Sequence, residues 1–305
     1  MTLSIKKIIN RLGEMNEPLL NTELTELSNL TAEKMVFLES CWKAIIPERR
    51  RQIADRLVEL AEDSIELNFD VIFKYCLEDT DDEVRVKAIE GLWENEEPSL
   101  IDSLIKMLEQ DESESVQAAA ALALGKYAVL AEHGKLRDVH ASRVQKALLT
   151  AIGDKTKDFE VNRRALEAAA PVSLPDVREA IGDAYTSLVP GLKVSAIYAM
   201  GKSCDAIWLP ILLKELSSVD VEVRYEAAGA CGELEEEEAV PYLINAVDDS
   251  DVDVRMAAIQ ALGKIGNAQA KGCLKQCLES DNEAIRLAAE QALNESDLRE
   301  EPLPF

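Results

Sequence analysis

A short helical segment recurs along this chain at a nearly fixed interval. Residues 219–249 can be aligned with residues 250–280 so that an apolar residue, an arginine and two alanines share the same columns. Across the chain the aligned apolar residues are separated by 32, 45, 31, 31, 31 and 31 residues. Such a period is typical of repeat arrays, in which no single unit buries its own apolar face. The aligned residues are Val84, Val116, Val161, Leu192, Val223, Val254 and Ile285.

Small side chains repeat behind each aligned residue. The fourth residue after it is alanine in all seven units, and the seventh is glycine once and alanine six times. Positions i, i+4 and i+7 share one face of an α-helix. The pattern therefore predicts one helix per unit, here called helix A, whose stripe of small side chains lets a neighbouring helix approach closely.

The residues around this stripe indicate where helix A begins and ends. Three residues before the aligned position, six units have an N-capping residue, each stabilising its helix by about 1 kcal/mol; the seven residues are Asp81, Ser113, Asp158, Val189, Asp220, Asp251 and Asn282. Gly and Asn tolerate the left-handed conformation that ends helices. We therefore expect helix A to end nine residues after the aligned position, at Trp93, Gly125, Ala170, Gly201, Gly232, Gly263 and Asn294.

A second apolar segment, helix B, follows helix A in most units. Pro210 and Pro241 lie 31 residues apart in its first turn, where a missing N–H costs nothing. Low glycine and proline content (13 and 10 residues) and 5% aromatic residues also favour helix. We predict an all-α fold, a right-handed α-solenoid of stacked helical hairpins, with A helices outside and B helices lining the inner curve.

The repeated residues resemble those of HEAT repeats, particularly the short, alanine-rich repeats of the bacterial phycobilisome lyase-like HEAT-repeat family. The pattern D-x-x-V-R-x-x-A-x-x-A-L-G is carried by Asp251, Val254, Arg255, Ala258, Ala261, Leu262 and Gly263. The resemblance implies the solenoid fold. It is less informative about function, since the family hosts scaffolds, assembly factors and a few enzymes.

The period divides the chain into three parts. We predict an N-terminal helical cap with degenerate repeats at 1–80, a repeat array at 81–294 and a flexible acidic tail at 295–305. The 45-residue interval places an insertion at about 126–141. Insertions in arrays decorate one face and often carry what is individual about the protein.

The net charge of -25, from 33 basic and 58 acidic residues, limits the choice of ligand. Such a surface repels nucleic-acid phosphates and anionic lipid, and it attracts partners with a basic surface. No stretch approaches the roughly 20 apolar residues of a membrane span. Six scattered cysteines without a CxxC motif are best explained as buried thiols in a reducing cytosol. We expect a cytoplasmic protein that binds neither nucleic acid nor membrane.

Motifs for catalysis and metal binding are missing. HEAT-repeat enzymes of the deoxyhypusine hydroxylase type hold iron with paired His-Glu motifs, whereas this chain has two histidines and no His-Glu dipeptide. Glycine-rich phosphate motifs and GxSxG are absent. We predict no catalytic residues, cofactor or metal, and hence no enzyme. A bilin lyase-like enzyme, or a chaperone for chromophore attachment, stays open as the alternative.

The recurring arginine after the aligned residue has a structural interpretation. Arg85, Arg224, Arg255 and Arg286 occupy this position, and a catalytic residue is not usually copied into every repeat. We expect each arginine to pair either with an acid of its own first turn, such as Glu222, or with the turn of a neighbouring unit.

Three groups of residues are candidates for binding a partner protein. The insertion forms a mildly basic island that could be a specific contact loop, although a longer helix A with a solvated turn and no special role is the simpler explanation. The acidic run between helices A and B of one unit would attract a basic partner, unless it is merely a solvated turn. The third group lies on the exposed face of the B helices. The candidates are His133, Lys135, Arg137 and His140; Glu235, Glu236, Glu237 and Glu238; and Asp102, Lys106, Arg178, Lys214, Asn245, Lys271 and Lys275. We predict a non-enzymatic scaffold or assembly factor.

Overall fold

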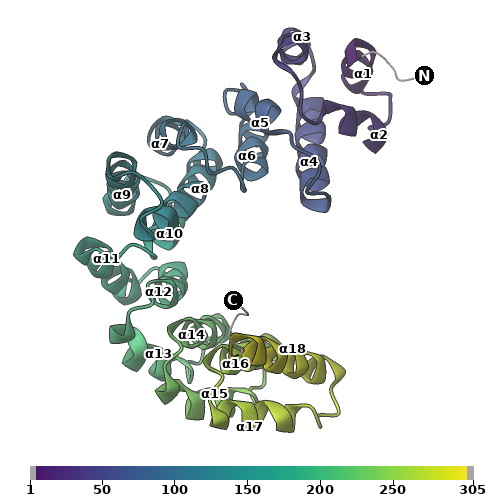
Figure 1. Ribbon diagram of the computed structural model, residues 1–305. Coiled ribbons are helices and arrows are strands. Elements are labelled where there is room, and N and C mark those ends of the chain that lie inside the picture. Colours follow the sequence, from purple (N-terminus) through teal and green to yellow (C-terminus); the bar gives the residue numbers. More distant parts are fainter. Residues whose placement is uncertain (1–4, 301–305) are drawn as a thin grey trace. The chain divides into compact units, whose positions relative to one another are not determined.

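The computed structural model describes residues 5–300, and this part of the chain contains eighteen α-helices and no strand (Figure 1). The predicted all-α solenoid fold is confirmed. The chain forms two compact units, one ending at Ala168 and the other starting at Ala169.

The first unit is built from paired helices, with the boundary falling near the end of α10. The A helices are α6, α8 and α10, and α4 is the equivalent helix of the N-terminal part. The B helices are α5, α7 and α9. The helices are α1 (Ile5–Leu12), α2 (Asn21–Leu24), α3 (Ala32–Trp42), α4 (Pro47–Asp63), α5 (Asp70–Cys76), α6 (Asp82–Gly91), α7 (Leu100–Gln110), α8 (Glu114–Glu132), α9 (Asp138–Gly153) and α10 (Phe159–Ala169).

In the second unit A and B helices alternate regularly. The A helices are α12 (Pro190–Lys202), α14 (Val221–Leu234), α16 (Val252–Ile265) and α18 (Glu283–Glu300). The B helices are α11 (Pro175–Thr186), α13 (Leu209–Glu215), α15 (Val240–Ala246) and α17 (Ala268–Cys277). As predicted, Pro210 and Pro241 lie in the first turns of α13 and α15.

The predicted starts of helix A are correct. Asp81 precedes α6 and accepts a hydrogen bond from Val84 N at 3.2 Å. Asp251 precedes α16 and accepts from Asp253 N at 2.9 Å. These caps satisfy backbone donors that have no partner inside their helix.

The predicted ends of helix A are wrong in most units, although α10 ends at Ala169, next to the predicted Ala170. Gly232 and Gly263 lie inside α14 and α16, which continue to Leu234 and Ile265. These glycines are there because the next A helix lies too close for a side chain. A Cβ on Gly232 would lie 2.8 Å from Ala261 Cα. The same contact recurs between Gly201 and Ala230 and between Gly263 and Ala292.

The layers of the second unit also differ from the prediction. Consecutive A helices, from α12 to α18, approach one another to backbone contact, whereas consecutive B helices lie further apart (Figure 1). In a curved two-layer stack the inner helices are the more closely spaced, because the inner arc is shorter. The A helices therefore form the inner layer of this unit, and the expectation that the B helices line the inner side is wrong here.

The last A helix carries polar residues where earlier A helices contact the next repeat. Glu290 and Asn294 of α18 are exposed, while the equivalent Ile259 and Gly263 of α16 are buried. α18 runs to Glu300, so the predicted tail at 295–305 begins within a helix, and residues 301–305 lie outside the described residues. The exposed face of α18 is therefore more polar than the face of α16 that packs on its neighbour.

We predict that Gly232→Ala lowers the free energy of unfolding by about 1–3 kcal/mol, because the new Cβ overpacks the α14–α16 contact. This effect outweighs the gain of up to about 1 kcal/mol that alanine brings to a helix interior. Urea denaturation followed by circular dichroism measures the change.

Gly229→Ala is the matched control. Gly229 lies on the same helix, and its Cβ would meet no atom within 4 Å. We expect unchanged or slightly raised stability. Equal destabilisation by both variants would contradict the close-packing explanation.

Candidate functional site

The recurring arginine links one repeat to the turn of the next. Arg224 donates through Nε and Nη2 to the carboxylate of Asp249, at 2.8 and 2.9 Å, and through Nη1 to Ser218 O at 2.9 Å. Of the two predicted pairings, the neighbouring turn is therefore correct and the first-turn acid Glu222 is not the partner. The hydrogen bond from Arg224 holds the pKa of Asp249 below its usual value.

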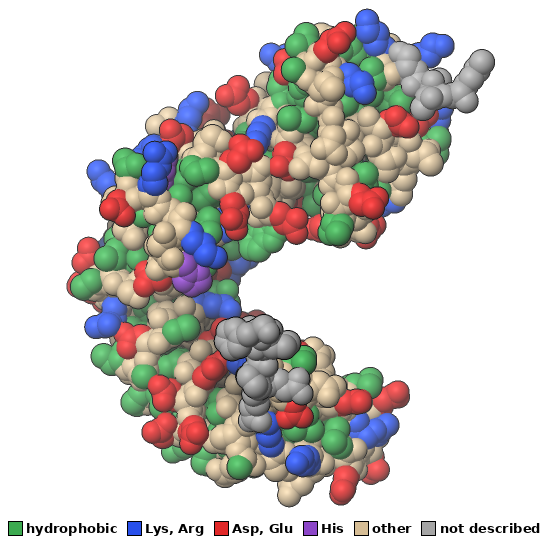
Figure 2. Space-filling view, in the orientation of Figure 1, with side chains coloured by type: hydrophobic (Ala, Val, Ile, Leu, Met, Phe, Trp, Pro, Cys, Tyr) green, Lys and Arg blue, Asp and Glu red, His purple; other side chains and the backbone are tan. Residues whose placement is uncertain are grey.

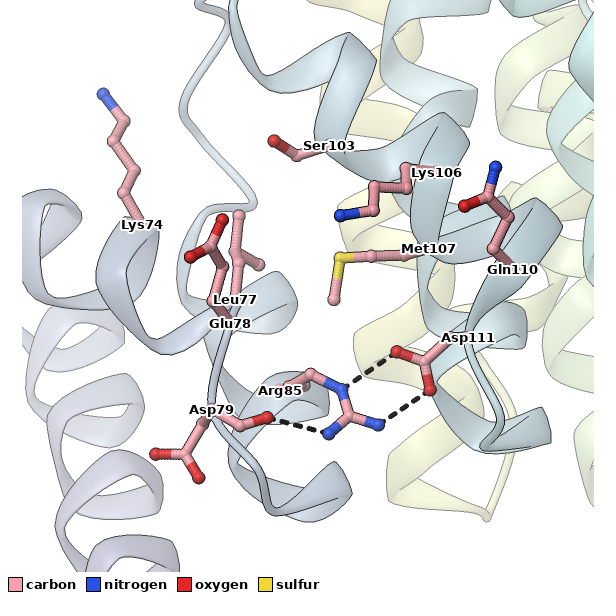
Figure 3. Close-up of a pocket in the computed structure, with 10 residues that line it drawn as sticks. All are labelled: Lys74, Leu77, Glu78, Asp79, Arg85, Ser103, Lys106, Met107, Gln110 and Asp111. Carbon is pink, nitrogen blue, oxygen red and sulfur yellow. Dashed lines mark hydrogen bonds and ion pairs between the residues drawn. The ribbon is translucent and has the colours of Figure 1, made fainter. Parts of the chain in front are cut away.

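The first unit repeats this arrangement (Figure 3). Arg85 donates to both carboxylate oxygens of Asp111, at 2.9 and 2.7 Å, and to Asp79 O at 2.8 Å. Asp111 also accepts from Ser113 N at 2.9 Å, so the same carboxylate shapes the turn and receives the arginine. Sequence reasoning missed Asp111 and Asp249, although their place two residues before each helix cap could have indicated them.

In the described part of the chain, Arg255 has no carboxylate to receive it. Arg255 donates Nη1 to Asp249 O at 2.8 Å, as its equivalents do, but its Nε has no partner within residues 5–300. The residue 31 positions after Asp249 is Ser280, whose hydroxyl accepts from Asn282 N at 3.2 Å. The serine keeps the turn but cannot pair with the arginine.

A groove of about 500 Å³ lies between α5 and α7, on the B-helix side of the first unit (Figure 3). Lys106, one of the predicted contact residues, extends from α7 into it, and Glu78 approaches from the turn after α5. Arg85 and Asp111, already paired with each other, form one end. Besides this pair, the groove is lined by two lysines, Lys74 and Lys106, and two acidic residues, Glu78 and Asp79, so its surface is mixed and polar.

The other B-helix candidates are dispersed. Asp102, Arg178, Lys214, Asn245 and Lys275 are exposed, as predicted, while Lys271 is half-buried. Four of these charges are in ion pairs: Asp102 with Arg143 at 2.5 Å, Arg178 with Asp205 at 2.7 Å, Lys214 with Glu215 at 3.6 Å, and Lys271 with Asp297 at 2.8 Å.

The insertion mostly lengthens two helices. α8 continues to Glu132 and α9 starts at Asp138, so only residues 133–137 lie between them. Gly134 has φ +68° and ends α8, and the buried Leu136 anchors the turn. His133, Lys135 and Arg137 are exposed, whereas His140 is half-buried in the first turn of α9. The longer-helix alternative describes this segment, and its contact role stays a prediction.

The acidic run surrounds a tight connection between α14 and α15. Glu235 adopts a left-handed conformation (φ 55°) and pairs with Arg299 at 2.5 Å. Glu236 precedes the 3-10 turn Glu237–Ala239, and Glu237 and Glu238 are exposed. On the face shown in Figure 2, acidic side chains are distributed over both units with basic ones interspersed.

Most of the thiols are poor nucleophiles. Burial raises the pKa of Cys231 to about 12 and that of Cys277 to about 11, so both are protonated at neutral pH. Cys204 differs from the predicted buried thiols, since it is exposed in a left-handed turn (φ 49°). Within residues 5–300, no cluster of three His, Cys, Asp or Glu side chains is arranged to hold a metal ion.

Lys126 acts as a structural cation. Its Nζ donates to Leu92 O and Trp93 O, at 2.7 and 3.1 Å, and thereby satisfies carbonyls beyond the end of α6. Burial lowers the pKa of Lys126 to about 8.

The family model for HEAT repeats matches residues 69–170 and 209–294, more than half of the chain. The chain belongs to the HEAT-repeat family. A comparison with curated proteins found no match. None of the described helices is long and apolar enough to cross a membrane.

Solved structures with similar folds are distant in sequence. The CpcE–CpcF complex of a phycocyanin lyase from a Nostoc species is 18% identical, with a TM-score of 0.49 over 74% of this chain and 93% of that chain. Human deoxyhypusine hydroxylase is 18% identical, with a TM-score of 0.32 over 96% of each chain. Kap95p, solved with RanGDP, is 14% identical, with a TM-score of 0.45 over 96% of this chain and 40% of that one.

We predict that Ser280→Asp raises the free energy of unfolding by about 0.5–1.5 kcal/mol. The new carboxylate would give Arg255 the partner that Asp249 gives Arg224, while still accepting from Asn282 N. Urea denaturation of a double-mutant cycle with Arg255→Met measures the coupling.

The gain should vanish when Arg255 is methionine. A gain of the same size in that background would mean that the aspartate acts on the turn alone, and the proposed equivalence of the two HEAT repeats would be wrong.

Proposed function

We propose that this HEAT-repeat protein is a non-enzymatic scaffold or assembly factor that binds a partner protein. One observation carries the proposal: the repeated glycines, alanines and arginines are used for packing. The small side chains join neighbouring A helices, and the arginines join repeats to turns. What remains for function is the surface that this packing leaves exposed.

The charge of that surface favours a partner with a basic patch. The chain carries a net charge of -25, and exposed carboxylates such as Glu237 and Glu238 lie in turns at the edge of the stack. Long-range attraction of this kind raises association rates and is screened by salt. The turn with His133, Lys135 and Arg137 offers the opposite charge and would contact an acidic part of the same partner.

The competing proposal is a bilin lyase-like enzyme or a chaperone for chromophore attachment. It would require a ligand that co-purifies with the protein or reacts in its presence. Visible absorbance of the purified protein distinguishes the two proposals, because a bound bilin is coloured and a protein partner is not.

We predict that affinity capture of the tagged protein from its native host recovers one stoichiometric, colourless protein partner at about 50 mM salt. At about 500 mM salt the recovery should fall at least about tenfold, because screening weakens a charge-steered complex. Quantitative mass spectrometry measures both amounts.

Lys135→Glu combined with Arg137→Glu reverses the charge of the insertion turn without touching its buried anchor Leu136. Recovery unchanged by this variant would remove the turn from the interface. A coloured preparation, or no partner at any salt concentration, would refute the scaffold.

A further inference from the structure

Exposed apolar side chains line the inner layer of the second unit at repeated positions. Val221 and Tyr225 of α14 are 41% and 44% exposed, Val252 of α16 is 44% exposed, and Leu287 of α18 is 59% exposed. Met256 of α16 is half-buried at the same position. Monomeric proteins rarely expose large apolar side chains in adjoining groups unless the group binds something.

The repeat register places these side chains next to one another. Tyr225, Met256 and Leu287 follow each other at intervals of 31 residues, as do Val221 and Val252. Their helices α14, α16 and α18 pack in direct contact through glycine and alanine. Val221 lies four residues before Tyr225, and Val252 lies four residues before Met256, so each pair shares one face of its helix. The five residues therefore form one surface, here called the apolar strip.

The strip borders a groove of about 510 Å³ between α16 and α18. Met256 and Leu287 form its apolar sides, and Gln260 and Gln291 add amide groups that can bind a peptide backbone. A groove of this size accommodates several side chains of a bound segment.

Two acidic side chains lie beside the strip, together with the half-buried Arg255, whose described hydrogen bonds go to carbonyls. Glu222 and Asp253 are exposed next to Val221 and Val252, and neither is in an ion pair within the described residues. The nearby Lys202 and Lys264 of the same layer share the carboxylate of Glu233, at 3.1 and 2.8 Å, which offsets one of their two positive charges. A partner that covers the strip therefore meets uncompensated carboxylates.

We infer that the apolar strip binds a segment of the partner protein that combines aliphatic or aromatic side chains with lysine or arginine. The apolar side chains fill the space around Tyr225, Met256 and Leu287, and the cations pair with Glu222 and Asp253. This inference rests on the proposed scaffold function and adds the surface and the chemistry of the segment. The surface lies on the A helices, apart from the B-helix residues predicted from the sequence.

Site-specific photo-crosslinking in the native host tests the surface. A benzoylphenylalanine replaces Tyr225 in one variant and Tyr242 in the other. Tyr242 is a matched control, because it is 47% exposed and lies on α15, in the other layer. We expect a crosslinked protein from position 225 and none from position 242, with the crosslinked segment containing both apolar and basic residues.

A synthetic peptide copied from that segment then tests the chemistry. We expect Leu287→Ala and Tyr225→Ala each to weaken its binding about tenfold or more, as interface anchors do. Glu222→Gln combined with Asp253→Asn should weaken binding at low salt. Asp176→Asn combined with Glu179→Gln, two exposed acids of α11, should leave it unchanged.

The outcomes separate this inference from the scaffold function. Three results would overturn the inference and leave the scaffold function in place. They are crosslinking from position 242 alone, a crosslinked segment without basic residues, and peptide binding that is unchanged in the strip variants. A partner that reaches neither position overturns the inference as well. If capture recovers no partner protein at all, both proposals fail.

Discussion

The close approach of neighbouring A helices governs most of the second unit. At Gly201, Gly232 and Gly263 the next helix lies so near that its alanine backbone occupies the space of a Cβ. Packing at this distance brings many atoms into dispersion contact, although each pair contributes little. It also draws the A helices together relative to the B helices, which sets the side on which each layer lies. A larger residue at one of these positions would alter the spacing as well as the stability.

The arginine–turn contacts add direction to this packing. Small apolar side chains allow neighbouring helices to slide past each other. The guanidinium of Arg224, which donates to both carboxylate oxygens of Asp249, fixes one position of the two repeats relative to each other. Repeats without the arginine are connected by other polar contacts. In the second compact unit, Lys193 and Tyr185 both bind the buried Glu215, at 2.8 and 2.7 Å. Each link also satisfies buried polar groups, which would otherwise destabilise the interface.

Sequence reasoning reached the fold because repetition amplifies weak signals. One capping aspartate is common, but Asp220 and Asp251 at matching places, with alanines at fixed distances behind them, define a helix and its face. The same reasoning failed at Gly232, because glycine ends helices and also permits close packing, and the sequence alone does not separate these roles. It also assigned the inner layer to the wrong helices. Both helices of a repeat are amphipathic, and the spacing of consecutive helices within each layer depends on how the repeats stack.

The binding surface was harder to find for a related reason. Val221, Tyr225 and Leu287 have the residue types of a buried core, and a helical pattern assigns such residues to packing. Their exposure becomes visible only when the direction of the alanine stripe is known, because that stripe occupies the buried face. An apolar residue that repeats on the opposite face has no packing role within the stack. Its persistence over consecutive helices is then an argument for a partner, and the acidic residues beside it determine which partner fits.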